Sequence, residues 1–486
     1  MSQTSPYQTP KHGHAEHPPA PEPVFDPSTP WYRMLNKHQW FVLTMATLAW
    51  VLDCLDQQLF VLARPAAMDA LCKPHGMDPK AFGGYATAIF VLGWATGGLI
   101  FGAVGDRIGR AKTLTLTVLI YSLCTGLSAF SRNFTEFALY RFVTGLGVGG
   151  VFGLAVALVA DTLPSQARSK ALGTLQAMSA VGNVTAGLCS MWMGSLVQSK
   201  VIATGDSWKY LFWIGALPAL LCVALAIRMK EPEKWVTARA AGRVTGVKFG
   251  SYASLFGIPR WRRHALAGMT LCLAGVIGVW GIGFFASDLV GLVLDKSLRA
   301  EGLTTNEVAS QKVTWIGVSS IIQNIGAFLG MLAFTWLAQK IGRKRSFVIA
   351  TLCAMAATIF FFQTFNGKHH VWMSGVMGFF QLALFAGFAI YLPELFPLRL
   401  RSTGVSFCYN VGRFLAATGP FTLGVLQAHL AEKAVAGAKA LGDAAVLEAK
   451  LNAFREAACW VAIVYLIGLV ALPFLPETKD HPLPED

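Results

Sequence analysis

Two aspartates, Asp53 and Asp56, interrupt an apolar run between positions 40 and 62. In a helix, positions i and i+3 share one face, so these carboxylates would lie close together, with Gln57 beside them. A charge at the centre of a membrane helix costs about 2.5–3.5 kcal/mol on insertion scales. Two neighbouring carboxylates cannot both ionise cheaply. The pattern predicts a proton-coupling site at Asp53 and Asp56; the alternative is a permanent ion pair with an arginine.

Two arginines, Arg141 and Arg413, also lie within apolar runs. A cation there needs an anionic partner, and arginine suits planar carboxylates. Both are therefore candidate ligands for an anionic substrate, with a permanent pair to Asp53 or Asp56 as the alternative. Further side chains within apolar runs are candidate lining of the same site: Gln57, Gln176, Asn183, Gln323, Asn324, Gln381, Tyr409, Asn410 and Trp280.

A set of mostly charged residues recurs at a constant spacing. Segment 106–110 matches segment 339–343, and 339 − 106 = 233; Asp161 matches Glu394, and 394 − 161 = 233. A common offset indicates two related halves, which in a membrane protein usually flank a substrate path. The first copy holds Asp106, Arg107, Gly109, Arg110, Asp161 and Arg168, and the second holds Gln339, Arg343, Glu394 and Arg401.

The recurring residues have the chemistry of a gate. Asp106 ends an apolar run, and its carboxylate can accept hydrogen bonds from the first amides of a neighbouring helix. Gly109 permits a tight turn, and Arg107 and Arg110 can reach Asp161 or nearby carbonyls. We expect this network to hold one side of the protein shut; the alternative is a static anchor. Gln339 replaces the acid in the second copy, so that copy should be weaker or absent.

The amino-acid composition indicates that membrane-spanning helices position these side chains. Of 486 residues, 54% are hydrophobic and only 14% are charged, against about 25% charged in soluble proteins. We find about twelve apolar runs near the roughly 20 residues that span a bilayer, six in each half. The sequence predicts an all-α membrane protein of twelve transmembrane helices in two pseudo-symmetric six-helix bundles. The net charge of +14 lies largely in short loops, as membrane orientation requires, which excludes a nucleic-acid partner.

The predicted organisation has five parts. A disordered cytoplasmic tail (1–35) precedes the first bundle (36–228), a basic cytoplasmic linker (229–264), the second bundle (265–476) and a short cytoplasmic tail (477–486). We expect a monomeric, multi-pass protein of the cytoplasmic membrane with both termini inside. No nucleophile–base set, phosphate loop or dinucleotide motif stands out, and no metal or cofactor is expected, so an enzyme is not predicted.

Three segments carry a family resemblance. Residues 102–110, Gly-Ala-Val-Gly-Asp-Arg-Ile-Gly-Arg, resemble the loop 2–3 signature of the major facilitator superfamily. Residues 141–147 resemble its fourth-helix motif, and residues 393–404 resemble the loop 10–11 segment of its sugar and organic-acid porters. Paired acids in the first span are similar to those of proton-linked organic-acid porters. The resemblance implies a carrier that works by alternating access.

These observations favour proton-coupled symport of a small organic acid, such as a monocarboxylate or a sialate. A sugar or polyol proton symporter is the main alternative, because residues 393–397, Pro-Glu-Leu-Phe-Pro, also suit that class. An exporter or a non-transporting nutrient sensor is a weaker alternative. The partners expected are a small-molecule substrate, a proton and the lipid bilayer.

Overall fold

The computed structural model describes residues 25–26, 28–216, 228–416, 429–430, 432 and 443–485, and regular structure in them is helical throughout. The first half contains α1 (Lys37–Cys72), α2 (Pro79–Ile108), α3 (Arg110–Ser128), α4 (Phe134–Thr162), α5 (Ser165–Ala177), α6 (Ser179–Gln198) and α7 (Ser207–Ala216). The second contains α11 (Pro259–Ile277), the π-helix η4 (Gly278–Gly283), α12 (Phe284–Ala300), α13 (Thr305–Ile341), α14 (Arg343–Thr364), α15 (Trp372–Glu394), α16 (Arg401–Ala416), α18 (Asp443–Ala462) and α19 (Tyr465–Ala471). Between them lie α9 (Glu233–Thr245) and α10 (Tyr252–Gly257).

Within the described residues, nine helical stretches are long and apolar enough to cross a bilayer. The other predicted spans correspond to three interrupted elements. Helices α7 and α16 each end next to undescribed residues, at 217–227 and 417–428. The seventh predicted span, at 265–293, is not one regular helix, because η4 separates α11 from α12. The predicted domain boundaries remain predictions.

Equivalent glycines bring helices into backbone contact in both halves. A Cβ on Gly97 of α2 would lie 2.0 Å from the carbonyl oxygen of Leu146 in α4. Its counterpart Gly330 of α13 would meet the carbonyl oxygen of Phe379 in α15 at 1.9 Å, and 330 − 97 = 233. Only glycine allows such an approach. The repeat therefore reaches into the packing of the helices.

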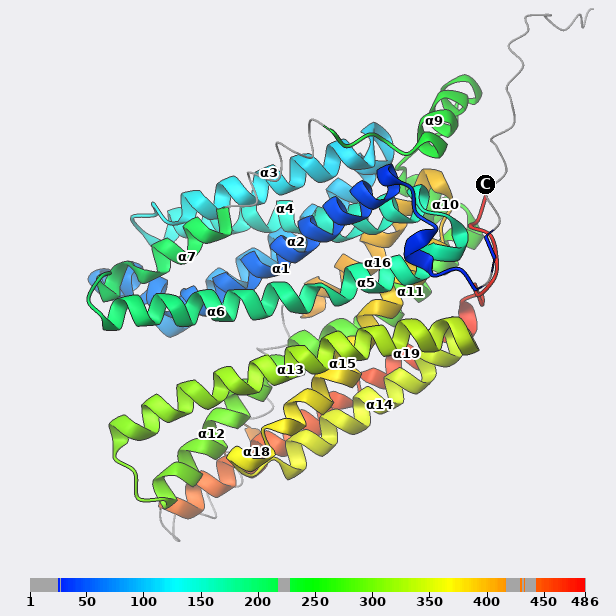
Figure 1. Ribbon diagram of the computed structural model, residues 1–486. Coiled ribbons are helices and arrows are strands. Elements are labelled where there is room, and N and C mark those ends of the chain that lie inside the picture. The colour runs from blue at the N-terminus through cyan, green and yellow to red at the C-terminus, as the bar shows by residue number, and fades with distance from the viewer. Residues whose placement is uncertain are drawn as a thin grey trace, which may run out of the picture.

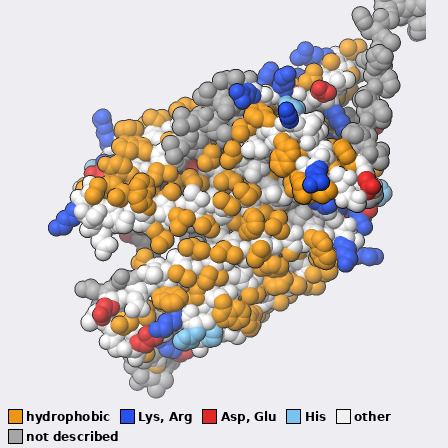
Figure 2. Space-filling view, in the orientation of Figure 1, with side chains coloured by type: hydrophobic (Ala, Val, Ile, Leu, Met, Phe, Trp, Pro, Cys, Tyr) orange, Lys and Arg blue, Asp and Glu red, His pale blue; other side chains and the backbone are white. Residues whose placement is uncertain are grey.

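The two halves lie side by side and diverge toward the end that holds α7 and α12 (Figure 1). At the opposite end, α16 packs against α2 and α4, and α13 packs against α5. This end also carries the turns at Gly109 and Gly342, and we call it the motif side. Figure 2 shows hydrophobic side chains across the middle of the visible face, with charged side chains toward its two ends. Such an apolar band is expected of a surface in contact with lipid tails.

Candidate functional site

Asp53 and Gln57 form one polar pair inside the apolar body of α1. The Asp53 side chain is fully buried, and Gln57 Nε2 donates to its Oδ2 at 2.8 Å. Its other oxygen has no hydrogen-bond partner in the described part of the chain. The guanidinium of Arg413, on α16 in the other half, is the cation that acts on this carboxylate, although neither Asp53 oxygen is paired with it among the described residues. Asp53 therefore faces a charge that belongs to the opposite half.

Arg413 is a buried cation held mainly by aromatic rings. Its guanidinium carbon lies 3.9 Å from the ring centre of Trp94 on α2 and 4.3 Å from that of Tyr409 on its own helix. Nη1 donates to the Tyr409 carbonyl at 2.7 Å, whereas Nε has no hydrogen-bond partner among the described groups. Cation–π contacts stabilise a guanidinium without neutralising it. Arg413 thus retains the capacity to bind a carboxylate.

Asp56 and Arg141 form a second couple, which lies within the first half. Arg141 Nη2 donates to Ser128 Oγ at 2.7 Å and to Thr125 Oγ1 at 3.2 Å, and its guanidinium carbon lies 4.8 Å from the ring centre of Phe212. Arg141 is the main cation acting on Asp56, and both side chains are fully buried. The two aspartates are neighbours on α1, but they face different arginines.

The remaining candidate lining residues do not form one cluster. Asn183 Nδ2 donates to Asn324 Oδ1 at 3.1 Å and so connects α6 with α13 across the two halves. Asn410 instead packs on Gly98 and donates to the Gly149 carbonyl at 3.3 Å, which gives it a packing contact between α16 and α4.

Five further candidates for the lining remain. Gln381 donates to Thr358 inside the second half, the Tyr409 ring stacks on Phe152 at 3.8 Å, and the buried Gln176 has an unpartnered Oε1 in the described structure. Gln323 is half-buried on α13. The side chain of Trp280 lies outside the described residues.

The first copy of the repeated motif joins the two halves at buried groups. Asp106 accepts from the backbone nitrogens of Ser402 and Thr403 at 3.2 and 2.8 Å, and from Thr403 Oγ1 at 2.7 Å. These are the first amides of α16, where an anion is favoured by the helix dipole. Asp161 pairs with Arg110 of its own half and with Arg401 of the other. The contact expected of Asp106 is present, while its role as a gate remains a prediction.

The two other basic members of the first half contact carbonyls. Arg107 Nε donates to the Gly250 carbonyl of the linker at 3.1 Å. Arg168 Nε donates to the Ala160 carbonyl at 2.8 Å, and its counterpart Arg401 donates likewise to Pro393 at 3.1 Å. These equivalent contacts bind each arginine to the end of the preceding long helix.

The second copy is present but is built differently. Arg343 pairs with Glu394 at 2.8 Å, within the second half. Across the halves, its Nη2 donates to Ser169 Oγ at 2.8 Å. Gln339 Nε2 is buried and has no hydrogen-bond partner within the described residues. The second copy was expected to be weaker or absent. The Arg343–Glu394 pair is present, but Gln339 supplies no counterpart to the carboxylate contact that Asp106 makes with the opposite half.

Two glutamates that the repeat analysis missed cap the helices after the motif turns. Glu231 accepts from the backbone nitrogens of Arg110, Ala111 and Lys112 at 2.7–3.2 Å. Glu477 accepts from those of Arg343 and Lys344 at 2.8 and 3.0 Å. Since 477 − 231 = 246, the pair does not obey the 233-residue offset. A different pattern in the sequence could have identified both caps: each glutamate stands next to a proline just after the sixth or the twelfth span, in Glu231-Pro232 and Pro476-Glu477.

The glutamate caps also explain the turn glycines. Gly109 and Gly342 have φ angles of +125° and +94°, which side chains other than glycine rarely adopt. A Cβ would lie 2.3 Å from the Glu231 carboxylate at the first position and 2.8 Å from that of Glu477 at the second. Glycine is therefore required by both the backbone and the neighbouring acid.

The comparisons with known proteins agree with this architecture. The chain is 27% identical over 450 residues to a probable 4-methylmuconolactone transporter of Cupriavidus pinatubonensis, covering 92% of this chain and 93% of that protein. It is 26% identical over 343 residues to a cis,cis-muconate transport protein of Acinetobacter baylyi, covering 69% and 76%. The solved structure of a proton:xylose symporter has the same fold, with a TM-score of 0.68, 18% identity and coverage of 92% and 98%.

The family follows from the sequence and the packing together. The model of the Major Facilitator Superfamily matches residues 46–420, which is more than half of the 486 residues. The predicted all-α membrane fold of two related six-helix bundles is thereby confirmed, with equivalent helix contacts in the two halves. The protein is a multi-pass membrane transporter, and the chain belongs to the Major Facilitator Superfamily.

Proposed function

We propose that this transporter carries a small organic acid together with a proton, by alternating access. The observation that carries the proposal is Arg413: it is 2% exposed, it faces the other half, and aromatic rings rather than a bound carboxylate surround it. An arginine in such a setting can form a bidentate pair with a planar carboxylate. A relative named as a muconate transporter supports an acid as the substrate.

Asp53 is the proposed proton carrier, because it shares the interface with Arg413. When Asp53 is ionised, its charge attracts Arg413 and competes with a substrate carboxylate for the same cation. When it is protonated, that competition ends, so proton binding and acid binding favour one another. Asp56 faces Arg141 inside the first half and lacks this direct link to the interface. We therefore rank Asp56 below Asp53 as the candidate proton carrier.

The same proposal gives the motif side a function. Buried contacts between Asp106 and the start of α16 join the two halves on that side, which supports its assignment as a gate. Rocking of the halves would break them and open a path to the central residues. We propose that the motif side faces the cytoplasm, that both termini lie there, and that the unit of transport is a monomer in the cytoplasmic membrane.

Counterflow into proteoliposomes tests the substrate class. Vesicles loaded with one of a panel of acids, their amides, and sugars would be tested for uptake of the labelled compound. We expect exchange with acids that carry a planar carboxylate and none with their amides. Exchange with sugars alone would overturn the acid proposal and establish the sugar alternative.

Neutral variants of the two aspartates test the coupling. Asp53→Asn should abolish accumulation driven by a proton gradient while exchange at equal pH continues, because the site stays intact but cannot release a proton. Asp56→Asn is the matched control on the same helix and should affect accumulation less. Normal accumulation in both variants would place the coupling site elsewhere.

A further inference from the structure

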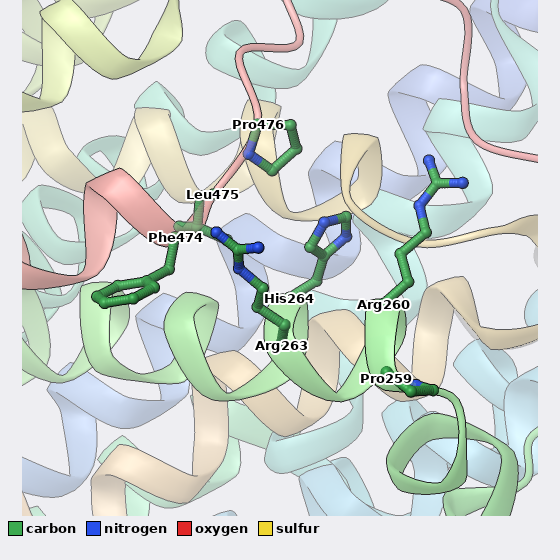
Figure 3. A pocket seen from close by; sticks show the side chains of 7 residues that line it. All are labelled: Pro259, Arg260, Arg263, His264, Phe474, Leu475 and Pro476. Carbon is green, nitrogen blue, oxygen red and sulfur yellow. The ribbon is translucent and has the colours of Figure 1, made fainter.

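A cavity of about 430 Å³ lies at the motif side, between the first turns of α11 and the end of the last membrane helix. It is separate from the couples around Asp53 and Asp56. Figure 3 shows Arg263 and His264 rising from α11 toward the chain segment at Leu475 and Pro476, with Arg260 rising from the same helix farther from that segment. Its full lining is Pro259, Arg260, Arg263, His264, Phe474, Leu475 and Pro476.

The charge of this cavity has one sign. Arg260 and Arg263 stand at positions i and i+3 of α11, one turn apart, and no acidic residue lines the cavity. Within the described structure the partners of these guanidinium groups are aromatic rings: Arg260 lies 4.6 Å from the ring centre of Trp261, and Arg263 lies 5.7 Å from that of Phe474. The nearest acid in sequence, Glu477, is occupied by the first amides of α14. The cavity thus presents two cations without a protein anion.

His264 has a fixed orientation beside the two arginines. Its Nδ1 lies 2.9 Å from the Leu395 carbonyl oxygen. Because a carbonyl can only accept, Nδ1 carries the hydrogen and Nε2 remains for other contacts. The Trp261 ring packs edge-on against the imidazole, with 5.7 Å between ring centres. The contacts with Leu395 and Trp261 therefore fix the imidazole of His264 in the cavity wall.

An apolar surface continues from the cavity along the outside of the bundle. Ile467 and Val470 lie one turn apart on α19, and Phe474 ends the short 3₁₀ helix Leu472–Phe474 that follows; all three are exposed. Leu266, one turn after Arg263 on α11, is exposed as well. In a membrane protein such a face contacts acyl chains. Arg260 and Arg263, at the end of this apolar face, would then lie at the depth of the lipid phosphates.

We propose that this cavity binds the phosphate of an anionic phospholipid, with the acyl chains along the apolar face of α19. Arg260 and Arg263 would hold the phosphate oxygens, since guanidinium groups form paired hydrogen bonds with phosphate. Basic pockets between membrane helices are known to recognise anionic headgroups. A free phosphate would meet the same cations but would gain nothing from the apolar face, so the lipid is the favoured source.

Native mass spectrometry of the full-length protein with phosphatidylglycerol, cardiolipin or phosphatidylcholine tests the proposal. The double variant Arg260→Gln/Arg263→Gln removes both cations. Arg262→Gln is the matched control, because Arg262 is exposed on the same turn but does not line the cavity. At about 1 kcal/mol for each arginine near an anionic lipid, the double variant should bind anionic lipid on the order of thirtyfold more weakly. The control variant should match the parent.

A competition arm separates the two sources of phosphate. Inorganic phosphate and glycerol 3-phosphate, added in excess at constant ionic strength, should not displace the lipid. Displacement by either would show that the site takes a soluble phosphate, which overturns the lipid proposal. Equal lipid binding by the double variant and Arg262→Gln would overturn the site itself. All variants are surface changes, and their unfolding midpoints should equal that of the parent.

Discussion

The two copies of the repeated motif use similar residues but join the halves to different extents. In the first copy, Asp106 and Asp161 both contact the second half, at Thr403 and Arg401. In the second, the Arg343–Glu394 pair stays within one half, and the described contact across the interface is the hydrogen bond to Ser169. A repeat in sequence is thus not a repeat in contacts, because Gln339 lacks the carboxylate with which Asp106 holds the start of α16.

The helix that the first copy holds is α16, which also carries Arg413. Thr403 and Arg413 are ten positions apart, 413 − 403 = 10, or roughly 15 Å along a helix. A movement that frees the start of α16 from Asp106 therefore also moves the cation proposed to bind substrate. Under the proposed function, this connection would link opening of the motif side to binding of the substrate.

The largest difference between the copies should appear on removing one acid from each. Asp161→Asn leaves the buried Arg110 and Arg401 without this carboxylate, and loss of one partner from a buried pair costs about 3–5 kcal/mol. Glu394→Gln leaves Arg343 in a pair whose side chains are 7% and 10% exposed, so we expect a clearly smaller loss. Thermal unfolding of both variants in lipid nanodiscs measures the difference. Equal losses would contradict the ranking of the copies.

The second prediction concerns the opening of the motif side. Hydrogen bonds to a charged group contribute about 1.5–3 kcal/mol, so Asp106→Asn should raise the open population by roughly tenfold or more. Gln339→Asp should act in the opposite direction and less strongly, since the new carboxylate would lie opposite Ser169 and Lys170 by the 233-residue relation (402 − 233 = 169; 403 − 233 = 170).

Thiol labelling at Ser402→Cys reports this population. Ser402 is fully buried and its hydroxyl has no partner in the described structure, so cysteine should be tolerated there. Labelling of the parent, which has its own cysteines, is subtracted as the control. Unchanged rates in both variants would reduce the motif to a topological anchor.

The smallest effect should come from the two glutamate caps. Burial alone would raise the pKa of Glu477, but hydrogen bonds from the backbone nitrogens of Arg343, Lys479, Lys344 and Thr478 hold its pKa below the ordinary value of 4.5. Its stabilising contribution is therefore complete above pH 4.5 and is lost as the pH falls through the lower folded value. Glu477→Gln should cost about 1 kcal/mol at pH 7.

The pH dependence distinguishes this cap from a general loss of stability. Between pH 4.5 and 3, the unfolding midpoint of the parent should fall more steeply than that of Glu477→Gln. Parallel curves for the parent and Glu477→Gln would show that the cap carries no proton-linked stability.

The sequence predicted the fold and the location of the network because both rest on strong local patterns. Apolar runs give the spans, and the constant offset gives the pairing of the motif copies. Partners from segments with a different offset, such as Glu231 and Glu477, could not be found by that rule. Neither the offset nor the helix spacing predicts which partner a side chain meets. Asp53 and Asp56 share a helix face, yet they face arginines in different halves. Asn410 was predicted as lining, but its contacts are packing contacts.

The central claim is that Arg413 binds the carboxylate of an organic acid, and Arg413→Lys tests it most directly. Lysine keeps the charge but offers a point donor in place of a planar pair. Binding of an accepted acid and of its amide would be measured by calorimetry on the parent and the variant. The account predicts that affinity for the acid falls by about tenfold or more, while the weak binding of the amide does not change. Equal losses for acid and amide would contradict it.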